Sequence, residues 1–496
     1  MRRTQGPRSR NLSSVELIGT AAGGMRESMK DKFQYFVKCI CFFILLGLII
    51  SSVYNVLRWK DTTGEYLSSV EQLYATPEGL IDVVFLGSSH CYCGILPAIL
   101  WKQYGIAAFD MSVSSQDKNS SYHDLIELYK TQSPSVIYVD LHALTYDQHM
   151  LVSNVYRNYL SLKTSSNSVA LVNEYIEEED RESFYLRFPI IHTRYRELKK
   201  YDFLDYAPNF FGRGEYLGWR ISGTWLDPEV INNRTIAELS EKNREWMEKL
   251  IALAEEHGTK IEFITIPYPP TSSEQEILNA ADEMLTEMQY TYTNFNYLLD
   301  EMGIDLQNDF ADAEHLNVFG AEKLTTFLGE AIVEKYDLPD HRGDERYWQW
   351  ETDLKWYENA KLSNWMGKVS DPGEYVSGIM QFSGSITLVS LDGDYLNSEI
   401  DYFEILKPLG MNYEEYLSGG KWIYREGSLQ KIAENTIDAQ EVYYDFSRYD
   451  RVKLFYYDVL NTDNIMMGRE TYQSPFPLTF VTYDTLLEKV AVCGAF

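Results

Sequence analysis

Cysteine is scarce in this chain of 496 residues, which has only five. Five are too few for a disulfide scaffold in a protein of this length, so its fold must rest on an apolar core. Cys91 and Cys93 lie close together, but the other ligands of a metal site do not accompany them. We therefore interpret these two cysteines as small packing residues rather than as redox or metal-binding groups.

Lysine and arginine are scarce beyond residue 60. The whole chain has 44 Lys/Arg and 74 Asp/Glu, of which residues 1–60 hold ten and three. The remaining 436 residues carry 34 against 71, a net charge of −37. Such an acidic body should not bind nucleic acid non-specifically, because phosphate contacts need clustered Lys and Arg. We expect an acidic soluble body behind a basic N-terminal segment.

A long apolar run lies near the N-terminus. Residues 39–57 are mostly apolar and residues 33–37 extend the run, and about twenty such residues span a bilayer core. An A-x-A-like cleavage site, the mark of a removed signal peptide, is missing. Eight Lys/Arg precede the run and two follow it closely. The pattern predicts a disordered basic cytoplasmic tail over 1–32, a transmembrane helix over 33–59 and an extracytoplasmic body held in the cell membrane by this single lipid-facing anchor.

Strand and helix patterns alternate after an expected stalk over residues 60–75. Apolar runs predict strands at 81–86, 106–111, 135–141 and 261–266. Amphipathic patterns predict helices at 96–104, 122–131, 236–257, 274–302 and 318–336, whereas residues 150–235 are aromatic-rich and less regular. This alternation indicates an α/β domain over 76–340, with a mostly parallel sheet covered by helices on both faces.

The composition changes after Pro339. Residues 341–365 are polar with four tryptophans, and we expect a linker there. Residues 366–496 are rich in aromatic and β-branched residues with frequent Gly, Asp and Asn turns, and strands are expected at 386–391, 442–446, 452–457 and 478–482. This part is predicted to be a separate β-rich α+β domain with no cluster of chemically reactive residues.

The first strand of the α/β domain ends in a serine-rich turn. Gly87 follows the apolar run and is followed in turn by Ser88 and Ser89. A strand-to-helix turn is where an α/β enzyme can present a nucleophilic serine, because the hydroxyl is exposed and nearby backbone N–H groups can bind an oxyanion. An ordinary strand end with small turn residues fits this stretch equally well.

Asp312 and His315 lie three residues apart, just before the last helix of the α/β domain. An aspartate that accepts the Nδ1 proton of a histidine leaves Nε2 free to take a proton from a serine. Ser89, His315 and Asp312 can therefore form a catalytic triad. The alternative is a surface loop that leads into a helix, since both residue types are common in such places.

The Gly-Ser-Ser turn after an early strand, paired with a late Asp-x-x-His-Leu-Asn, resembles the SGNH, or GDSL-type, hydrolase superfamily. The resemblance covers residues 76–338. It implies a flavodoxin-like three-layer α/β/α sandwich, with Ser89 as nucleophile, His315 as base and Asp312 as the residue that orients His315. The membrane-anchored layout is similar to that of the D-alanyl transfer protein of teichoic-acid modification and of alginate O-acetylation proteins. The C-terminal part also resembles an interleukin-like EMT-inducer domain.

The oxyanion hole departs from the pattern of that superfamily. A glycine of the second sequence block and an asparagine of the third normally contribute to the hole, but Ser112 and the Asp140-Leu141-His142 sequence stand there. The resemblance leads us to expect the backbone N–H groups of Ser89 and Ser112 in this role, with Gln116 or His142 in place of the asparagine. An anionic Asp140 would oppose a developing oxyanion.

These features together predict an extracytoplasmic serine esterase or O-acyltransferase. Its expected substrates are acyl esters of a cell-surface glycopolymer, it would need no metal or organic cofactor, and a membrane-bound O-acyltransferase is a candidate partner. The alternative, which the altered oxyanion hole leaves open, is a non-catalytic SGNH-like scaffold that binds a surface polymer or a membrane acyltransferase.

Overall fold

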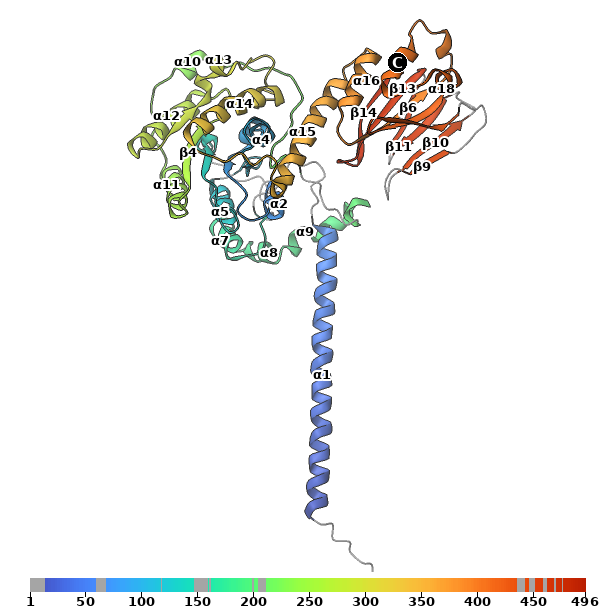
Figure 1. The fold of residues 1–496 in the computed structure, drawn as a ribbon. Helices are drawn as coiled ribbons and strands as arrows, with labels where there is room; N and C mark the ends of the chain where they lie inside the picture. Colours follow the sequence, from blue (N-terminus) through green and yellow to red (C-terminus); the bar gives the residue numbers. More distant parts are fainter. Residues whose placement is uncertain are drawn as a thin grey trace, which may run out of the picture. The chain divides into compact units, whose positions relative to one another are not determined.

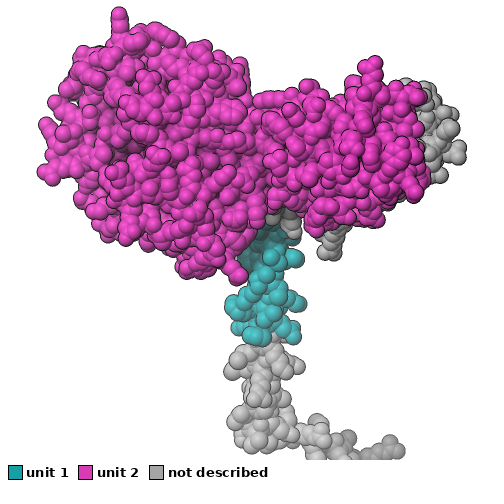
Figure 2. All heavy atoms as spheres, turned by 45° about the horizontal axis from the view of Figure 1, so that its top comes forward, with its two compact units in different colours: residues 1–60, 178–207 teal, residues 61–177, 208–496 magenta. Residues whose placement is uncertain are grey.

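The computed structural model describes residues 14–58, 68–116, 118–146, 159, 162–198, 200–203, 211–434, 442–445, 451–457, 462–467, 470–474 and 476–496. The chain divides into two compact units, residues 1–60 with 178–207 and residues 61–177 with 208–496 (Figure 2). Each unit is described by itself. Residues 1–13 of the expected tail and 60–67 of the expected stalk lie outside the described residues.

The first unit is built on one long helix, α1 (Ser14–Leu57) (Figure 1). Its segment Lys32–Leu57 has 26 residues, and the mean hydropathy over an 18-residue window within it is 2.5. Within the described ranges it is the one helix long and apolar enough to cross a membrane. The helix begins upstream of the apolar run, so residues 14–32 are helical rather than disordered as expected. Extending an existing helix avoids the cost of nucleation, which explains why a polar segment can continue it.

Short helical elements in residues 178–207 meet the end of α1. They are α8 (Arg181–Leu186), α9 (Phe188–Ile191), η2 (His192–Arg196) and η3 (Lys200–Phe203). The buried Arg194 guanidinium donates to the carbonyl oxygens of Leu57 (3.0 Å) and Arg58 (2.6 Å) and to Asp202 Oδ1 (2.6 Å). The last carbonyls of a helix lack partners within it, so Arg194 caps the C-terminal end of α1.

The second unit contains a five-stranded parallel sheet. Its strands are β1 (Val83–Leu86), β2 (Ala108–Asp110), β3 (Val136–Asp140), β4 (Lys260–Thr265) and β5 (Tyr292–Asn294), in the order β2-β1-β3-β4-β5. All neighbours pair in parallel, which confirms a mixed α/β fold with a parallel sheet. The strand order reverses between β1 and β3, and doubly wound sheets of this order bind ligands beyond the strand ends at that point.

Helices cover both faces of this sheet. Val84, Leu86 and Ile137 pack on one side against α5 (Lys118–Leu128), α11 (Glu241–Glu256) and α12 (Ser272–Glu287). Val83 and Phe85 pack on the other side against α4 (Pro97–Tyr104), α13 (Leu299–Met302) and α14 (Val318–Lys335). Successive side chains of a strand point to opposite faces, which explains why these strands are apolar throughout.

Two expectations for this region were wrong. The helix predicted at 274–302 ends with α12, and β5 follows, because the alternating Tyr and Thr residues at 290–293 favour a strand. Residues 68–75 of the expected stalk form helix α2 (Ser68–Ala75), and its buried Leu73 belongs to the core around β1 and β3.

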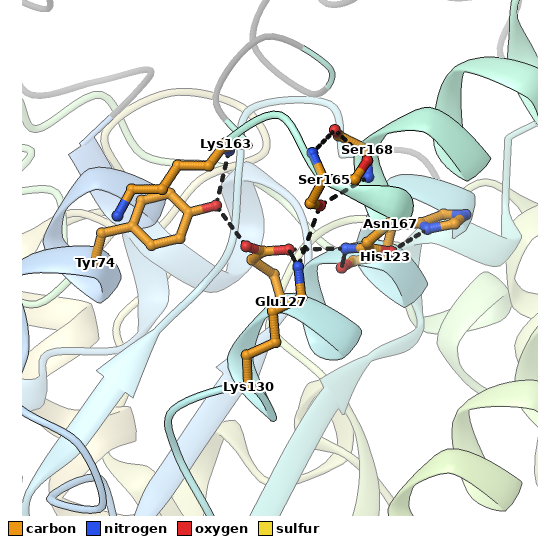
Figure 3. Close-up of polar contacts among 8 residues, drawn as sticks. All are labelled: Tyr74, His123, Glu127, Lys130, Lys163, Ser165, Asn167 and Ser168. Atoms are coloured by element: carbon orange, nitrogen blue, oxygen red, sulfur yellow. Dashed lines mark hydrogen bonds and ion pairs between the residues drawn. The ribbon is translucent and has the colours of Figure 1, made fainter.

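A buried carboxylate joins α2, α5 and α7 (Ser166–Tyr175), as Figure 3 shows. Glu127 accepts hydrogen bonds from Tyr74 Oη (2.8 Å), from Asn167 Nδ2 (3.0 Å) and from Lys130. Burial alone would raise the pKa of Glu127, but these three donors lower it below its ordinary value. The carboxylate is therefore held ionised at the junction of three helices that are distant in sequence.

The predicted linker is also folded. Residues 348–366 form helix α15 (Trp348–Met366), which contributes Trp350 to the core of the α/β region and Met366 to a core of the C-terminal region. Its buried Trp350, Asp353 and Tyr357 recur at helical spacing. The sequence pattern indicated a linker because the charged Asp353 interrupts the apolar positions on the buried face of this helix.

The outer edge of β2 is closed by groups from distant segments. Trp350 Nε1 donates to the carbonyl oxygen of Ala108 (2.8 Å), and Asp110 N donates to the carbonyl oxygen of Arg213 (2.8 Å). A Cβ on Gly214 would lie 1.8 Å from the Asp110 carbonyl oxygen, so only glycine allows this approach. The buried Arg213 side chain pairs with Asp353 of α15, which ties this loop to the helix. A sheet edge that would otherwise be open is thus covered.

The C-terminal region has two antiparallel sheets with the orders β14-β13-β6-β7-β8 and β12-β11-β10-β9. Ile386 and Leu388 of β6 pack on Val452 and Ile465 of the second sheet, while the opposite face of the first sheet packs on helices. The strands are β6 (Ser385–Leu391), β7 (Gly420–Arg425), β8 (Ser428–Ala433), β9 (Val442–Asp445), β10 (Arg451–Tyr457), β11 (Thr462–Met467), β12 (Glu470–Ser474), β13 (Leu478–Asp484) and β14 (Lys489–Ala495). Phe446, at the end of one predicted strand, lies outside the described residues.

The remaining helical elements are short or belong to the C-terminal region. They are α3 (Ser89–Gly94), η1 (Leu141–Leu144), α10 (Pro228–Ile231), η4 (Phe295–Tyr297), η5 (Glu345–Tyr347), α16 (Pro372–Gln381), η6 (Tyr395–Asn397), α17 (Tyr402–Leu406), η7 (Lys407–Leu409) and α18 (Tyr413–Ser418). Two of them, α3 after β1 and η1 after β3, begin at the point where the strand order reverses and bring side chains to the candidate site.

Candidate active site

The turn after β1 is sharp and tightly packed. A Cβ on Gly87 would lie 2.8 Å from Asp140 Cβ and 2.9 Å from Cys91 Cβ, so a larger residue does not fit. Helix α3 begins immediately afterwards, at Ser89. Ser88 is buried whereas Ser89 is partly exposed, so the turn gives two adjacent hydroxyls different surroundings.

The loop before α14 brings Asp312 and His315 to this turn. Asp312 Oδ1 accepts the backbone N–H groups of Glu314 (2.8 Å) and His315 (2.9 Å), which fixes the loop. His315 Nδ1 lies 3.0 Å from Asp312 Oδ1, and His315 Nε2 lies 2.9 Å from Ser89 Oγ. The three residues singled out in the sequence are therefore adjacent, although Ser89 and His315 are 226 positions apart.

The electrostatics of the Asp312–His315–Ser89 group suit proton transfer. Burial alone would raise the pKa of Asp312, but the Glu314 N–H and the neighbouring His315 lower it below its ordinary value. An ionised Asp312 accepts the Nδ1 proton of His315 and so leaves Nε2 as the acceptor for the Ser89 hydroxyl. This arrangement can convert Ser89 into a nucleophile.

The second serine of the turn contacts a different histidine. Ser88 Oγ lies 3.3 Å from Nδ1 of His142, which belongs to η1 after β3. The His142 ring also packs on His90, at 3.8 Å between ring centroids, and His90 lies 5.0 Å from the His315 ring. Burial, together with His142 and His315, lowers the pKa of His90. Burial, together with His315, lowers the pKa of His142 to about 3. Both rings are therefore neutral at ordinary pH.

An open cleft of about 690 Å³ lies over Ser89. His142 and Tyr146 line it on the side of β3, and Tyr216, Trp219 and Arg220 line it from the loop that follows Arg213. The same loop is fixed near the turn by a hydrogen bond from Tyr216 N to the carbonyl oxygen of Tyr92 (3.0 Å). The cleft combines a reactive centre with a wall that is partly aromatic.

Two of the predicted oxyanion residues do not reach this cleft. Ser112 N donates to Asp110 Oδ1 (2.8 Å), and Gln116 Nε2 donates to Asp124 Oδ2 (2.7 Å). Neither residue lines the cleft, so the expectation for Ser112 and Gln116 is corrected, while His142 does line it. The Ser112 N–H is not available to an oxyanion, because it already donates to the carboxyl group of Asp110.

Ser114 and Ser115, which no sequence pattern singled out, form a turn that lines the cleft. Ser115 has φ 51, a left-handed conformation that glycine adopts more readily than serine. Among the residues that the structure describes, neither the Ser114 nor the Ser115 backbone N–H has a hydrogen-bond partner. The Ser-Ser pair is a turn signal, but a serine in a glycine-like conformation is not recognisable from composition.

Two buried carboxyl groups flank the nucleophile turn without lining the cleft. Asp110 and Asp140 end the strands on either side of β1, and burial raises the pKa of each to about 7. Asp140 Oδ1 accepts the backbone N–H groups of Ile266 (3.3 Å) and His142 (3.5 Å), and Asp140 does not line the cleft. Asp140 is thus partly protonated near neutral pH, which weakens the opposition to an oxyanion that its charge would create.

Comparisons with known proteins give no family for the chain. No family model and no curated protein matches it. One solved structure that is similar to it is "a putative acylhydrolase" from Bacteroides fragilis, at 10% sequence identity, covering 56% of this chain and 99% of that chain, with a TM-score of 0.28. A likeness of that size carries no argument, so the proposal below rests on the geometry of the site.

Proposed function

We propose that this chain is a serine esterase or O-acyltransferase of the SGNH type. The observation that carries the proposal is the continuous contact from Asp312 through His315 to Ser89, at 3.0 and 2.9 Å, on the floor of an open cleft. The flavodoxin-like three-layer arrangement implied by the resemblance is part of the same proposal. The strand order and the helices on both faces of the parallel sheet support it.

The reaction proceeds through an acyl-enzyme. His315 Nε2 takes the proton of Ser89 Oγ while the oxygen attacks the acyl carbonyl, and the same proton then passes to the leaving alkoxide. Water or a sugar hydroxyl next attacks the acyl-serine, and His315 again removes and returns a proton. The backbone N–H groups of Ser89 and Ser115 are suited to donate to the negatively charged oxygen of each tetrahedral intermediate.

The wider layout of the chain supports a substrate class and a location. An aromatic wall that includes Tyr216 and Trp219 offers flat surfaces for sugar rings, which favours acyl esters of a cell-surface glycopolymer. The segment Lys32–Leu57 suits a membrane anchor, and the Lys/Arg asymmetry around it favours a body outside the cytoplasm. In this proposal the anchor holds the cleft near a membrane-bound O-acyltransferase, and the C-terminal region is an accessory module.

A serine-reactive fluorophosphonate probe tests the proposal against the scaffold alternative. We expect the full-length protein to be labelled on the peptide that contains Ser89, and Ser89→Ala to abolish labelling. Ser135→Ala, which changes an exposed serine of the same region, is the matched control and should be labelled normally. A folded wild-type protein that takes up no probe would favour a non-catalytic scaffold that binds a surface polymer or a membrane acyltransferase.

A further inference from the structure

Adjacent serines at the nucleophile turn form two separate serine–histidine pairs. Ser89 Oγ meets His315 Nε2 at 2.9 Å, and Ser88 Oγ meets His142 Nδ1 at 3.3 Å. The pairs differ in exposure, because Ser88 is only 2% exposed. Ser88 borders the cleft, but its burial makes it far less accessible to a substrate than Ser89, so Ser89 is the better placed nucleophile of the turn.

The burial of Ser88 decides which ring nitrogen of His142 carries the proton. The hydroxyl of Ser88 has His142 Nδ1 as its one hydrogen-bond partner among the described side chains. If Nδ1 were the donor, the hydroxyl proton of Ser88 would be buried without an acceptor, which costs about 1–3 kcal/mol. His142 Nδ1 therefore accepts a hydrogen bond from the Ser88 hydroxyl, and the single proton of the neutral ring is on Nε2.

That Nε2–H group is available to a substrate. In the described part of the chain Nε2 of His142 has no hydrogen-bond partner, and it is not among the buried unpaired polar atoms, unlike Nδ1 of the neighbouring His90. His142 lines the same cleft as Ser89 and follows the strand next to β1. The lowered pKa of His142 keeps the ring neutral, so its donor does not add a second positive charge beside His315.

We propose that His142 donates its Nε2–H to the oxyanion of the acyl-transfer intermediate, and that Ser88 is the positioning residue that fixes the required tautomer. This inference rests on the proposed function. It assigns His142 the task that an asparagine side chain would otherwise perform, and it gives a reason for the second serine of the turn. Gln116 is excluded from that task because its amide donates to Asp124.

The first test measures hydrolysis of p-nitrophenyl acetate by the full-length protein in detergent. His142→Ala should lower kcat by about 10²–10³-fold, the usual loss for one oxyanion donor, and kcat/KM should fall by a similar factor. His142→Asn and His142→Gln each keep an N–H donor, and at least one should recover tenfold or more over His142→Ala. Circular dichroism confirms that the variants are folded, and Ser135→Ala is the control.

The second test is a double-mutant cycle for Ser88. Ser88→Ala should lower kcat in the presence of His142, because the Nδ1–H tautomer then becomes accessible. The same substitution should have no effect on whichever amide variant at residue 142 is active, since an amide has no tautomers. Equal losses in both backgrounds would show that Ser88 acts only through the structure of the turn.

The outcomes separate the two proposals. A kcat within threefold of wild type in His142→Ala, with Ser89 still labelled by the fluorophosphonate, would overturn the role of His142 and leave the serine mechanism in place. Undiminished hydrolysis by Ser89→Ala would overturn the serine mechanism itself.

Discussion

The parallel sheet and the antiparallel sheets of this chain differ in where their strands end. All residues that line the candidate cleft lie within residues 88–316, in the loops and short helices around the parallel sheet. Parallel strands end at the same edge, so the segments after β1 and β3 place Ser89 and His142 side by side. In the antiparallel sheets successive strands end at opposite edges, so loops from neighbouring strands are not gathered in this way. We therefore expect substitutions at the ends of the parallel strands to change activity, and substitutions in the core of the antiparallel region to change stability alone.

The largest effect should come from breaking the site of the parallel sheet. Ser89→Ala or His315→Ala should each lower kcat by about 10⁴-fold or more, and the double variant should lose little beyond either single one, because the two side chains act as a unit. Asp312→Ala should cost less, since Asp312 orients His315 without touching the ester. Kinetics on p-nitrophenyl acetate, at folding matched by circular dichroism, measures all four variants.

Losses that multiply in the Ser89→Ala/His315→Ala variant would mean that the two residues act separately. In that case the parallel sheet would bring Ser89 and His315 close together without making them one catalytic unit, and its contrast with the antiparallel sheets would not hold.

A smaller effect should come from a cavity in the C-terminal region. Trp422 of β7 is fully buried on the helix-covered face of the first antiparallel sheet, and Trp422→Ala should cost about 3–5 kcal/mol of stability. Thermal unfolding followed by circular dichroism measures that loss, while kcat below the transition should stay at the wild-type value. Phe263→Ala, in β4, is the matched control, because it opens a cavity in the core of the parallel sheet and should affect both quantities.

If Trp422→Ala lowers kcat as much as Phe263→Ala does, the two regions behave as one cooperative unit. The separation that the comparison implies would then be wrong.

The smallest effect should be a pH dependence located in the parallel region. The pKa values of Asp110 and Asp140 are about 7 in the folded protein against an ordinary value of 3.8. The folded protein therefore binds protons that the unfolded chain has already released, so stability falls as pH rises from about 4 to about 7. Each group should reduce the free energy of unfolding by about 1 kcal/mol between pH 6 and pH 7.

Urea unfolding at these two pH values measures this change. Asp140→Asn keeps an oxygen acceptor for the Ile266 N–H and should flatten the dependence, whereas an unchanged slope in that variant would assign the effect to other groups.

Much of the parallel region was predictable, because its signals are local. The apolar runs predicted β1 to β4, and the spacing of Asp312 and His315 near a helix start predicted their contact with Ser89. Strand β5 was missed because it is short and lies between two helical patterns. Helix α15 was missed because Asp353 lies on its buried face, where Arg213 from a distant loop neutralises it.

The proposed oxyanion residues were less predictable, because their roles depend on backbone conformation and on distant partners. The sequence made Ser112 a reasonable candidate, but in the folded structure its backbone N–H donates to the Asp110 side chain. Ser115 adopts a positive φ that nothing in the local composition requires. The tautomer proposed for His142 follows from the burial of Ser88, which only the folded structure defines.

The closure of β2 by α15 has a consequence for synthesis. Trp350 is made 242 positions after its partner Ala108. At about 5–20 residues per second, a ribosome needs roughly 12–48 s to add that length of chain. During this interval the edge of the parallel sheet at β2 lacks the part of its cover that α15 supplies, and an open edge can pair with strands of other chains. The emerging protein is therefore exposed to mispairing at this edge until α15, at the start of its last third, has been translated.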